Sequence, residues 1–455
     1  MGGGLGAELA NWIVDGEPHI DLGEVDPRRF GPYANKAYTG RKNKEAFGHN
    51  FGIHYPGYEW PEARPAKTMP CYDRLNAAGA VWGAVYGWEI PLWFAPEDSE
   101  AKDIWSYRTF NSMPHIGAEC RAVRETAGLF EMTPMAKFEV AGPGAKAWLN
   151  RILANRMPRK IGGIVLAHLL THKGTIRCEF TVTRLGETSF YLVGTPRGER
   201  HDFDVLQKAL PADGTVTLTN VTAERGGLTL VGPEARDILR DLVDGDLGND
   251  AFPWMSAQAL TVGLASDVRM MRINYEGELG WELYHPIAYN LHLFEEICRA
   301  GEARGLKHCG YRAIESLRLE KSYRAIYRDL DLEHTALEAG LDRFIKWDKD
   351  EFVGQQALLK QRDAGLKHKM VALKVETVDA DAWMNESVFR DGRLVGRITS
   401  GATSHNIGNC LSMAYVELDQ ATPGTPLEVQ VLERRVPAIV ITDSPYDPEN
   451  NRPRM

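Results

Sequence analysis

The sequence lacks a long hydrophobic run. Its longest apolar stretches, at residues 163–170 and 436–441, are far shorter than the ~20 residues that a membrane-spanning helix needs. The first residues also lack the basic region and the apolar region of a secretory signal. We therefore expect a cytoplasmic protein with no membrane-embedded part.

Recognisable metal and disulfide motifs are missing too. The six cysteines are scattered without CxxC spacing, so buried and reduced thiols are expected. The most suggestive histidine pair is His168 and His172, but their surroundings predict a buried strand that ends in a turn. Four residues of a strand span about 13 Å, so these two side chains cannot share one zinc ion. The sequence therefore predicts no metal site.

Positive charge is in deficit. Lysine and arginine number 53 against 62 aspartate and glutamate residues, which gives a formal net charge of −9. A negatively charged protein does not attract the phosphates of nucleic acid, so nucleic acid is not expected as a partner. The hydrophobic content of 44% and the charged content of 25% are typical of a folded globular enzyme. A length of 455 residues favours about three domains.

Residues 1–100 are rich in turns and in aromatic residues. Thirteen of the 60 residues between Phe51 and Phe110 are aromatic, against 42 of all 455. In a segment with little regular structure, large rings can serve as anchors because each buries a large area. The alternative is an aromatic-lined pocket for a methylated cation.

The rest of the chain predicts two further regions. Residues 101–370 alternate strands and helices, with strands at 137–141, 189–194 and 228–232 and helices at 289–304 and 311–323. Residues 371–455 show short alternating strands with turns at Asp391-Gly392 and Pro423-Gly424. This last pattern is typical of a small antiparallel barrel or sandwich.

Six segments, in this order and at these separations, resemble the aminomethyltransferase (glycine cleavage T-protein) family. The likeness is greatest to the folate-binding half of dimethylglycine and sarcosine dehydrogenases, and it covers about residues 100–450. The segments are residues 127–133, 173–182, 274–283, 310–320, 337–342 and 396–401. Each alone is weak evidence, but together they are highly specific.

The resemblance implies an α+β fold, a T-protein-like multi-domain cloverleaf of mixed and antiparallel sheets with helices and a small C-terminal β-barrel. Residues 101–370 are then the folate-binding core, in two subdomains, and residues 371–455 the barrel. The resemblance also implies tetrahydrofolate as the cofactor, to which a small methylated substrate passes a one-carbon unit.

Three candidate cofactor-binding residues follow from the resemblance. The family's pterin-binding glutamate matches Glu282, and its site tyrosine matches Tyr275. An ionised carboxylate can accept two N–H groups of a pterin. Arg312 matches the arginine that binds the substrate or the folate, since a guanidinium fork suits a carboxylate. Arg318 and Glu320, on the same predicted helix, are expected to be ordinary surface charges.

The candidate catalytic residue departs from the family pattern. The family usually has an aspartate where this sequence has Glu179, and the additional methylene changes the reach of the carboxylate. A misplacement of about 1 Å can lower a rate about a hundredfold. Because neighbours on a strand alternate, we expect Cys178 to point away from the site if Glu179 points into it. His405 lies in a second departing loop and is expected to face solvent.

The first hundred residues extend the resemblance. Residues 2–18 resemble the last glycine turn and helix of the flavin domain in those dehydrogenases, and residues 53–75 resemble the linker beyond it. A dinucleotide-binding fold also needs a strand before the glycines and a second βα unit after them, and the sequence has neither. FAD is therefore not expected on this chain.

Three functions remain open. The first is a tetrahydrofolate-dependent demethylase that moves a methyl group from a small N-, S- or O-methylated substrate directly to the cofactor. The second is the folate-binding subunit of a dimethylglycine- or sarcosine-type dehydrogenase, which forms 5,10-methylenetetrahydrofolate with a separate flavoprotein. The third is a non-catalytic assembly subunit. Retention of Tyr275, Glu282, Arg312 and a carboxylate at position 179 argues against the third.

Overall fold

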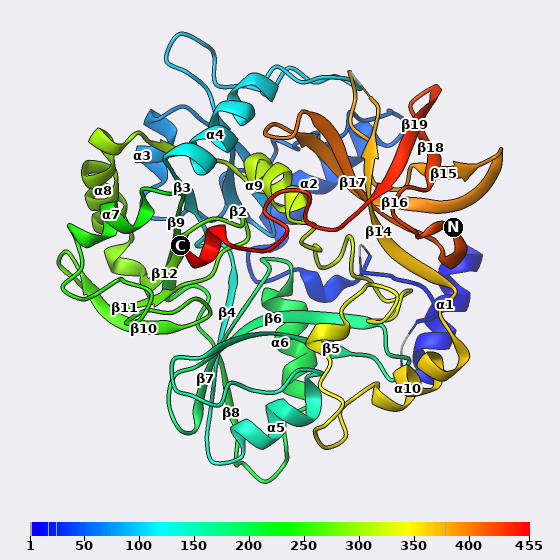
Figure 1. The fold of residues 1–455 in the computed structure, drawn as a ribbon, viewed down its shortest axis with the longest axis horizontal. Helices are drawn as coiled ribbons and strands as arrows, with labels where there is room; N and C mark the ends of the chain where they lie inside the picture. Colours follow the sequence, from blue (N-terminus) through cyan, green and yellow to red (C-terminus); the bar gives the residue numbers. More distant parts are fainter. Residues whose placement is uncertain (1, 17, 24, 378) are drawn as a thin grey trace.

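Three β-sheet units surround the middle of the molecule (Figure 1). The computed structural model describes residues 2–16, 18–23, 25–377 and 379–455. The units are a six-stranded sheet, a five-stranded sheet and a closed six-stranded barrel, accompanied by a two-stranded hairpin. Within the described ranges, no helix has both the length and the apolar composition needed to span a bilayer.

The six-stranded sheet has the order β10-β11-β12-β9-β3-β13. Its strands are antiparallel apart from the β13–β3 pair. Helices α3 (Tyr72–Ala77), α7 (Ala235–Arg240) and α8 (Asn290–Gly301) cover one face, on which Leu228, Leu283 and Leu293 share one core. The strands are β3 (Ala127–Glu131), β9 (Arg225–Val231), β10 (Ala257–Val262), β11 (Ala265–Met271), β12 (Gly280–Pro286) and β13 (Leu306–His308).

The five-stranded sheet is antiparallel and has the order β5-β6-β7-β4-β8. Helices α5 (Ala145–Ile152) and α6 (Gly198–Lys208) cover one face through a core that includes Phe138, Phe180 and Leu192. Cys178 is fully buried in that core. The strands are β4 (Ala136–Ala141), β5 (Ile164–Leu170), β6 (Ile176–Arg184), β7 (Ser189–Gly194) and β8 (Thr217–Asn220).

The opposite faces of the two sheets meet each other over part of their area. On the six-stranded sheet, Phe130 and Val231 of that face pack instead against helices α4 (Met113–Glu125) and α9 (Tyr311–Glu320). The rings of Tyr191 on β7 and Tyr284 on β12 pack edge to face with 5.7 Å between centroids. Arg269 of β11 forms an ion pair of 2.6 Å with Glu139 of β4. Because successive residues of a strand point to opposite faces, this packing also fixes which face each of the other strand residues adopts.

The C-terminal unit is a closed barrel of order β14-β17-β16-β15-β18-β19. Small and branched apolar side chains such as Val388, Ile398 and Val429 fill its interior. The strands are β14 (His368–Val375), β15 (Ser387–Arg390), β16 (Arg393–Ser404), β17 (Asn409–Glu417), β18 (Pro426–Val431) and β19 (Arg434–Ile441). The predicted α+β fold with a C-terminal β-barrel is confirmed.

Helix α9 (Tyr311–Glu320) lies between the barrel and the sheets. It contacts β16, α4 (Met113–Glu125) and the hairpin of β1 (Ala80–Val85) and β2 (Trp88–Phe94). The expectation that Arg318 and Glu320 are surface charges is wrong, since both side chains are fully buried. Arg318 pairs with Asp329 at 2.7 Å and with Glu315 at 2.9 Å. The helix is enclosed on several sides, so its charges need internal partners.

The N-terminal part runs from the edge of the molecule beside the barrel toward the middle of the view (Figure 1). Its helices α1 (Gly2–Asp15) and α2 (Lys36–His49) contain no buried residue, whereas Cys71, Leu75 and Trp93 lie in the cores of the sheet region. The boundary near residue 100 stays a prediction. Helix α10 (Gln355–Ala364) precedes the barrel. Short 3-10 turns occupy Pro27–Arg29, Ile287–Tyr289, Glu302–Arg304, Asp342–Phe344, Leu418–Gln420 and Arg452–Arg454.

The buried pair of Arg318 and Asp329 predicts a large effect on stability. Removing one partner leaves a buried charge uncompensated, so Arg318→Met is expected to destabilise the fold by about 3–5 kcal/mol. Arg328→Met is the control, because the Arg328 side chain is 47% exposed and its ion pair with Glu315 is partly open to solvent. It is expected to cost about 1 kcal/mol or less. Thermal unfolding of both variants tests this, and equal losses of Tm contradict it.

Candidate functional site

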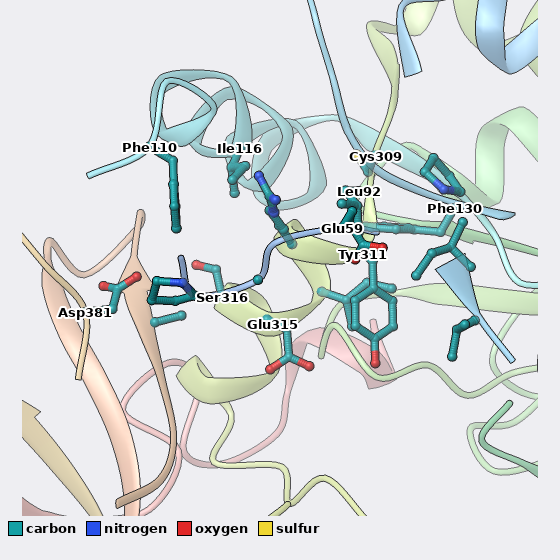
Figure 2. A pocket seen from close by; sticks show the side chains of 18 of the residues that line it. Glu59, Leu92, Phe110, Ile116, Phe130, Cys309, Tyr311, Glu315, Ser316 and Asp381 are labelled. Atoms are coloured by element: carbon teal, nitrogen blue, oxygen red, sulfur yellow. The ribbon is translucent and has the colours of Figure 1, made fainter. Parts of the chain in front are cut away.

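A cavity of about 360 Å³ lies where the three units meet. Its wall is formed by α9, the β1–β2 hairpin, α4, the end of β3 and β16. Figure 2 shows Glu315 and Ser316 of α9 in the middle, with Asp381 on the barrel side and Phe130 on the side of the six-stranded sheet. The cavity is therefore enclosed by parts of the chain that are far apart in sequence.

Acidic side chains contribute to this wall at four places. Burial raises the pKa of Glu59 and Asp381, and it raises that of Glu131 to about 7. Burial also acts on Glu315, but Arg318 and Arg328 outweigh it and lower the pKa of that carboxyl group. The cavity wall thus combines one firmly ionised carboxylate with three that burial makes less acidic than usual.

Glu282 lies on the same sheet face as the cavity residue Phe130. Phe130 of β3 is opposite Thr229 of β9, and Thr229 is opposite Glu282 of β12. Residues directly opposite across neighbouring strands share one face of the sheet. With about 4.8 Å between strands, Glu282 is about 10 Å from Phe130 along the sheet. Glu282 therefore points away from the helices on the other face. A turn at Gly277, which has a positive φ, leads into β12.

The Glu282 carboxyl group has few internal partners. Tyr284 donates its hydroxyl to Glu282 Oε2 at 3.0 Å. Burial raises the pKa of Glu282 to about 8, against a lowering by the Tyr284 hydroxyl, and the neighbouring Glu276 adds to the increase. Near neutral pH this carboxyl group is poised between its two protonation states. A ligand that donates N–H groups would favour the ionised form.

Tyr275 is held in the loop that leads into β12. The Asn274 side chain accepts the backbone N–H groups of Glu276 and Gly277, which fixes the turn. The Tyr275 hydroxyl donates to the carbonyl of Arg324 at 2.7 Å, and its ring stacks on Tyr323 with 5.8 Å between centroids. Burial raises the pKa of Tyr275 well above its usual value. The hydroxyl therefore stays protonated.

Glu179 lies on β6, on the face turned toward the six-stranded sheet. Its Oε2 is 2.8 Å from Nε2 of His168 on the neighbouring strand β5. The His168 side chain is 2% exposed and that of Glu179 is 17% exposed. The negative charge of Glu179, with that of Glu315, helps to raise the pKa of Tyr275. Glu179 is therefore close enough to Tyr275 for its charge to act on the hydroxyl group, although neither residue lines the cavity.

Arg312 lies at another side of the cavity, on α9. Its two terminal nitrogens contact the two oxygens of Asp103 at 2.6 and 2.8 Å, and Nη1 also donates to Ser112. The rings of Phe110 and Trp105 flank the guanidinium group. Of the four predicted site residues, Arg312 alone is part of the cavity wall. Its fork is already engaged with an internal carboxylate.

Sequence reasoning missed two residues near the site. His168 was expected on a buried strand, unable to share a zinc ion with His172, but its contact with Glu179 was not foreseen. The hairpin turn at Lys173-Gly174 places 168 opposite 179, so the register of that hairpin was the available signal. His405 was expected to face solvent, but it lines the cavity, and burial lowers its pKa. The position of His405 could not be predicted from the sequence, because it depends on the tertiary packing of β16 beside α9.

Some aromatic residues of the first hundred are anchors in the packed interior, while others, such as Phe51, are exposed. None of them lines the cavity. Tyr72 stacks on Trp82 with 4.3 Å between centroids, and the fully buried Trp93 stacks on His115. The aromatic residues that do line the cavity come from later segments, for example Phe110 and Trp383.

One group of potential metal ligands occurs among the described residues. Cys178, His201 and Asp202 lie close enough to share an ion. Burial raises the pKa of the Cys178 thiol well above its usual value, so the thiol stays protonated. Asp202 accepts hydrogen bonds from His201 and from the Tyr327 hydroxyl. Ordinary internal hydrogen bonds therefore account for this cluster.

Family models match three parts of the chain. The GCVT N-terminal domain matches residues 71–349, and the glycine cleavage T-protein C-terminal barrel domain matches residues 368–447. The FAD dependent oxidoreductase central domain matches residues 15–68. The first two matches coincide with the two sheets and with the barrel.

Individual proteins agree with these models. Dimethylglycine dehydrogenase, mitochondrial, of Rattus norvegicus is 35% identical over 100% of this chain and 53% of its own length. A probable aminomethyltransferase of Thermococcus kodakarensis is 30% identical over 80% of this chain and 92% of its own. The solved structure of aminomethyltransferase T from Bartonella henselae has a TM-score of 0.72 at 27% identity, covering 84% of this chain and 98% of its own.

This chain spans about half the length of the dehydrogenase relatives that it matches. It spans nearly the whole of the aminomethyltransferases. The resemblance found in the six sequence segments is confirmed by the models, the relatives and the fold together. The chain belongs to the glycine cleavage T-protein (aminomethyltransferase) family.

Proposed function

We propose that this protein transfers a one-carbon unit from a small methylated substrate to tetrahydrofolate, held between the two open sheets. The observation that carries the proposal is Glu282, a carboxyl group with one internal hydrogen bond and a pKa raised to about 8 by burial. A half-buried acid with so few partners among the described residues is suited to a ligand that supplies donors. Membership of the aminomethyltransferase family supports the choice of tetrahydrofolate.

The residues present fit a reduced pterin. Its planar ring carries adjacent N–H groups, which match the two oxygens of an ionised Glu282. The ring of Tyr275, stacked on Tyr323, supplies a flat apolar surface near Glu179. Tetrahydrofolate, when bound, supplies the nucleophilic nitrogen that accepts the carbon. The protein's own residues would bind the ring, orient it and exclude water.

Glu179 is the proposed general acid–base group. One carboxylate oxygen is engaged by His168, and the other has no hydrogen bond to any residue that the structure describes. The free oxygen can hold the proton that the leaving amine or water needs. Both terminal nitrogens of Arg312 donate hydrogen bonds to Asp103. To bind folate as well, Arg312 would have to contact the cofactor in addition to Asp103.

The route by which the carbon arrives has two candidates. In the first, a methyl group moves directly to tetrahydrofolate. In the second, a flavoprotein removes a hydride from an N-methyl group, and the resulting one-carbon unit is captured here while the amine leaves with a proton. The match of residues 15–68 to an FAD oxidoreductase domain favours the second. Phe47, Phe51 and Ile53 in this segment are 78%, 94% and 87% exposed, which favours a covering partner.

A cytoplasmic location stays a prediction of the sequence. The rat relative carries a mitochondrial designation in its name, which describes that protein. The absence of FAD from this chain also stays a prediction. The non-catalytic alternative requires that tetrahydrofolate does not bind, and the binding measurement below tests this directly.

Binding of tetrahydrofolate is expected to depend on Glu282 and on pH. The ionised form accepts N–H groups, so protonation below pH 8 competes with binding and lowers affinity up to about tenfold per pH unit. Glu282→Gln is expected to bind about 10- to 100-fold more weakly and without this pH dependence. Glu234→Gln, just before α7, is the control, because this side chain is 38% exposed and pairs with Arg304 on the helix-covered side of the sheet. Calorimetric titrations between pH 6.5 and 8.5 check this, and equal affinities contradict the assignment.

Glu179 is expected to act on turnover and not on binding. The probe is formaldehyde, the simplest one-carbon donor, which condenses with tetrahydrofolate and releases its oxygen as water. Wild type is expected to accelerate condensation over free tetrahydrofolate, and Glu179→Ala to lose about a hundredfold or more of that acceleration. Stopped-flow absorbance measures the rate. A variant that binds tetrahydrofolate normally and condenses it at the wild-type rate rules out this role.

The donor route is decided by a panel of methylated compounds. Dimethylglycine, sarcosine and a methylated sulfonium are each incubated with the protein and tetrahydrofolate, with and without a flavin-dependent amine oxidase. We expect 5,10-methylenetetrahydrofolate only when the oxidase is present, with no flavin absorbance from the purified chain itself. Formation of 5-methyltetrahydrofolate without the oxidase would establish direct transfer instead.

A further inference from the structure

His168 and Glu179 form a matched pair across the β5–β6 hairpin. Their Cα atoms are directly opposite in the register, and Nε2 and Oε2 are 2.8 Å apart. The histidine is 2% exposed, and the ring of Phe344 packs against it with 5.7 Å between centroids. The imidazole therefore has little freedom to move, and the contact is held by the hairpin on one side and by Phe344 on the other.

The length of the Glu179 side chain suits this contact. An aspartate at the same position would withdraw the carboxylate by about 1.5 Å, one carbon–carbon bond. The distance to His168 Nε2 would then exceed that of a hydrogen bond. The glutamate at position 179 and the histidine at position 168 are therefore geometrically dependent on each other.

The contact uses one carboxylate oxygen and leaves the other available. Oε1 of Glu179 has no hydrogen bond to any described residue, while Oε2 is bound by the histidine. Because Cys178 and Phe180 point into the helix-covered core, Glu179 between them points to the other face of β6, toward the six-stranded sheet. Without the histidine, the flexible glutamate would be free to turn either oxygen toward that sheet or away from it.

We propose that His168 is a positioning residue: its Nε2 holds Oε2 of Glu179 so that Oε1 stays directed toward the bound tetrahydrofolate. The inference rests on the proposed function, because Glu179 is the group that it positions. It assigns a role to a histidine that does not itself touch the substrate. The pair then acts as one unit, in which the hairpin supplies the geometry and the carboxylate supplies the proton.

Three variants separate positioning from stability. His168→Leu keeps an apolar side chain of similar size but removes the donor, whereas His168→Gln retains an N–H group at a similar reach. His172→Leu is the matched control, because His172 is exposed at the turn of the same hairpin. Thermal unfolding identifies any variant whose fold is impaired, and the Gln variant keeps the comparison informative if the Leu variant is unstable.

The readout is formaldehyde condensation with protein-bound tetrahydrofolate, together with the dissociation constant of tetrahydrofolate. We expect His168→Leu to lose at least about tenfold of the acceleration, with affinity unchanged, and His168→Gln to stay within about threefold of wild type. His172→Leu is expected to match wild type. A purely structural role would lower both affinity and Tm and would not be restored by glutamine.

The outcomes distinguish the two proposals. If wild type accelerates condensation and His168→Leu does so equally well, the positioning role is wrong while the proposed function stands. If Leu and Gln variants lose acceleration equally at normal Tm, the hydrogen bond is not what matters, and the inference is again overturned. If wild type binds tetrahydrofolate without accelerating condensation, the proposed function of Glu179 fails, and the role of His168 fails with it.

Discussion

Strand register fixes where the polar groups of the site can lie, because each of the two open sheets packs one face into a helix-covered core. Side chains alternate along a strand, so Phe180 and Leu283 enter the helix-covered cores while Glu179 and Glu282 point to the opposite faces of their sheets. A slip of one residue would exchange these faces and bury the carboxyl groups among apolar side chains. The fold and the candidate site therefore depend on the same strand register.

The acidic side chains of the interior differ in how many hydrogen-bond donors surround them. We interpret the fully paired Glu320 as structural and the incompletely paired Glu282 as the group that binds a ligand. Glu320 accepts hydrogen bonds from Arg124, Ser404 and Asn406, which joins α9 to α4 and to the barrel. Glu282 has a single hydroxyl donor and a pKa raised to about 8. Desolvating a carboxyl group without donors is unfavourable. A ligand that donates N–H groups to Glu282 offsets this desolvation cost and thereby gains binding free energy.

Local sequence patterns predicted much of the fold, and the resemblance supplied the four candidate site residues, of which Arg312 lines the cavity. The strand expected at 189–194 is β7, and alternation placed Cys178 in the core opposite Glu179. The helix expected at 311–323 ends at Glu320, where a turn begins. Burial of Arg318 could not be predicted, because the partner Asp329 follows an irregular segment. The engagement of Arg312 by Asp103 likewise depends on contacts between residues more than 200 positions apart.

The central claim is that a reduced pterin occupies the space between the two sheets with its N–H groups on Glu282. A crystal structure of the protein with tetrahydrofolate bound tests it most directly. We expect the pterin ring to lie beside Tyr275, with two of its nitrogen atoms within hydrogen-bonding distance of the Glu282 oxygens. A pterin bound elsewhere, or protein side chains filling that space, would contradict it.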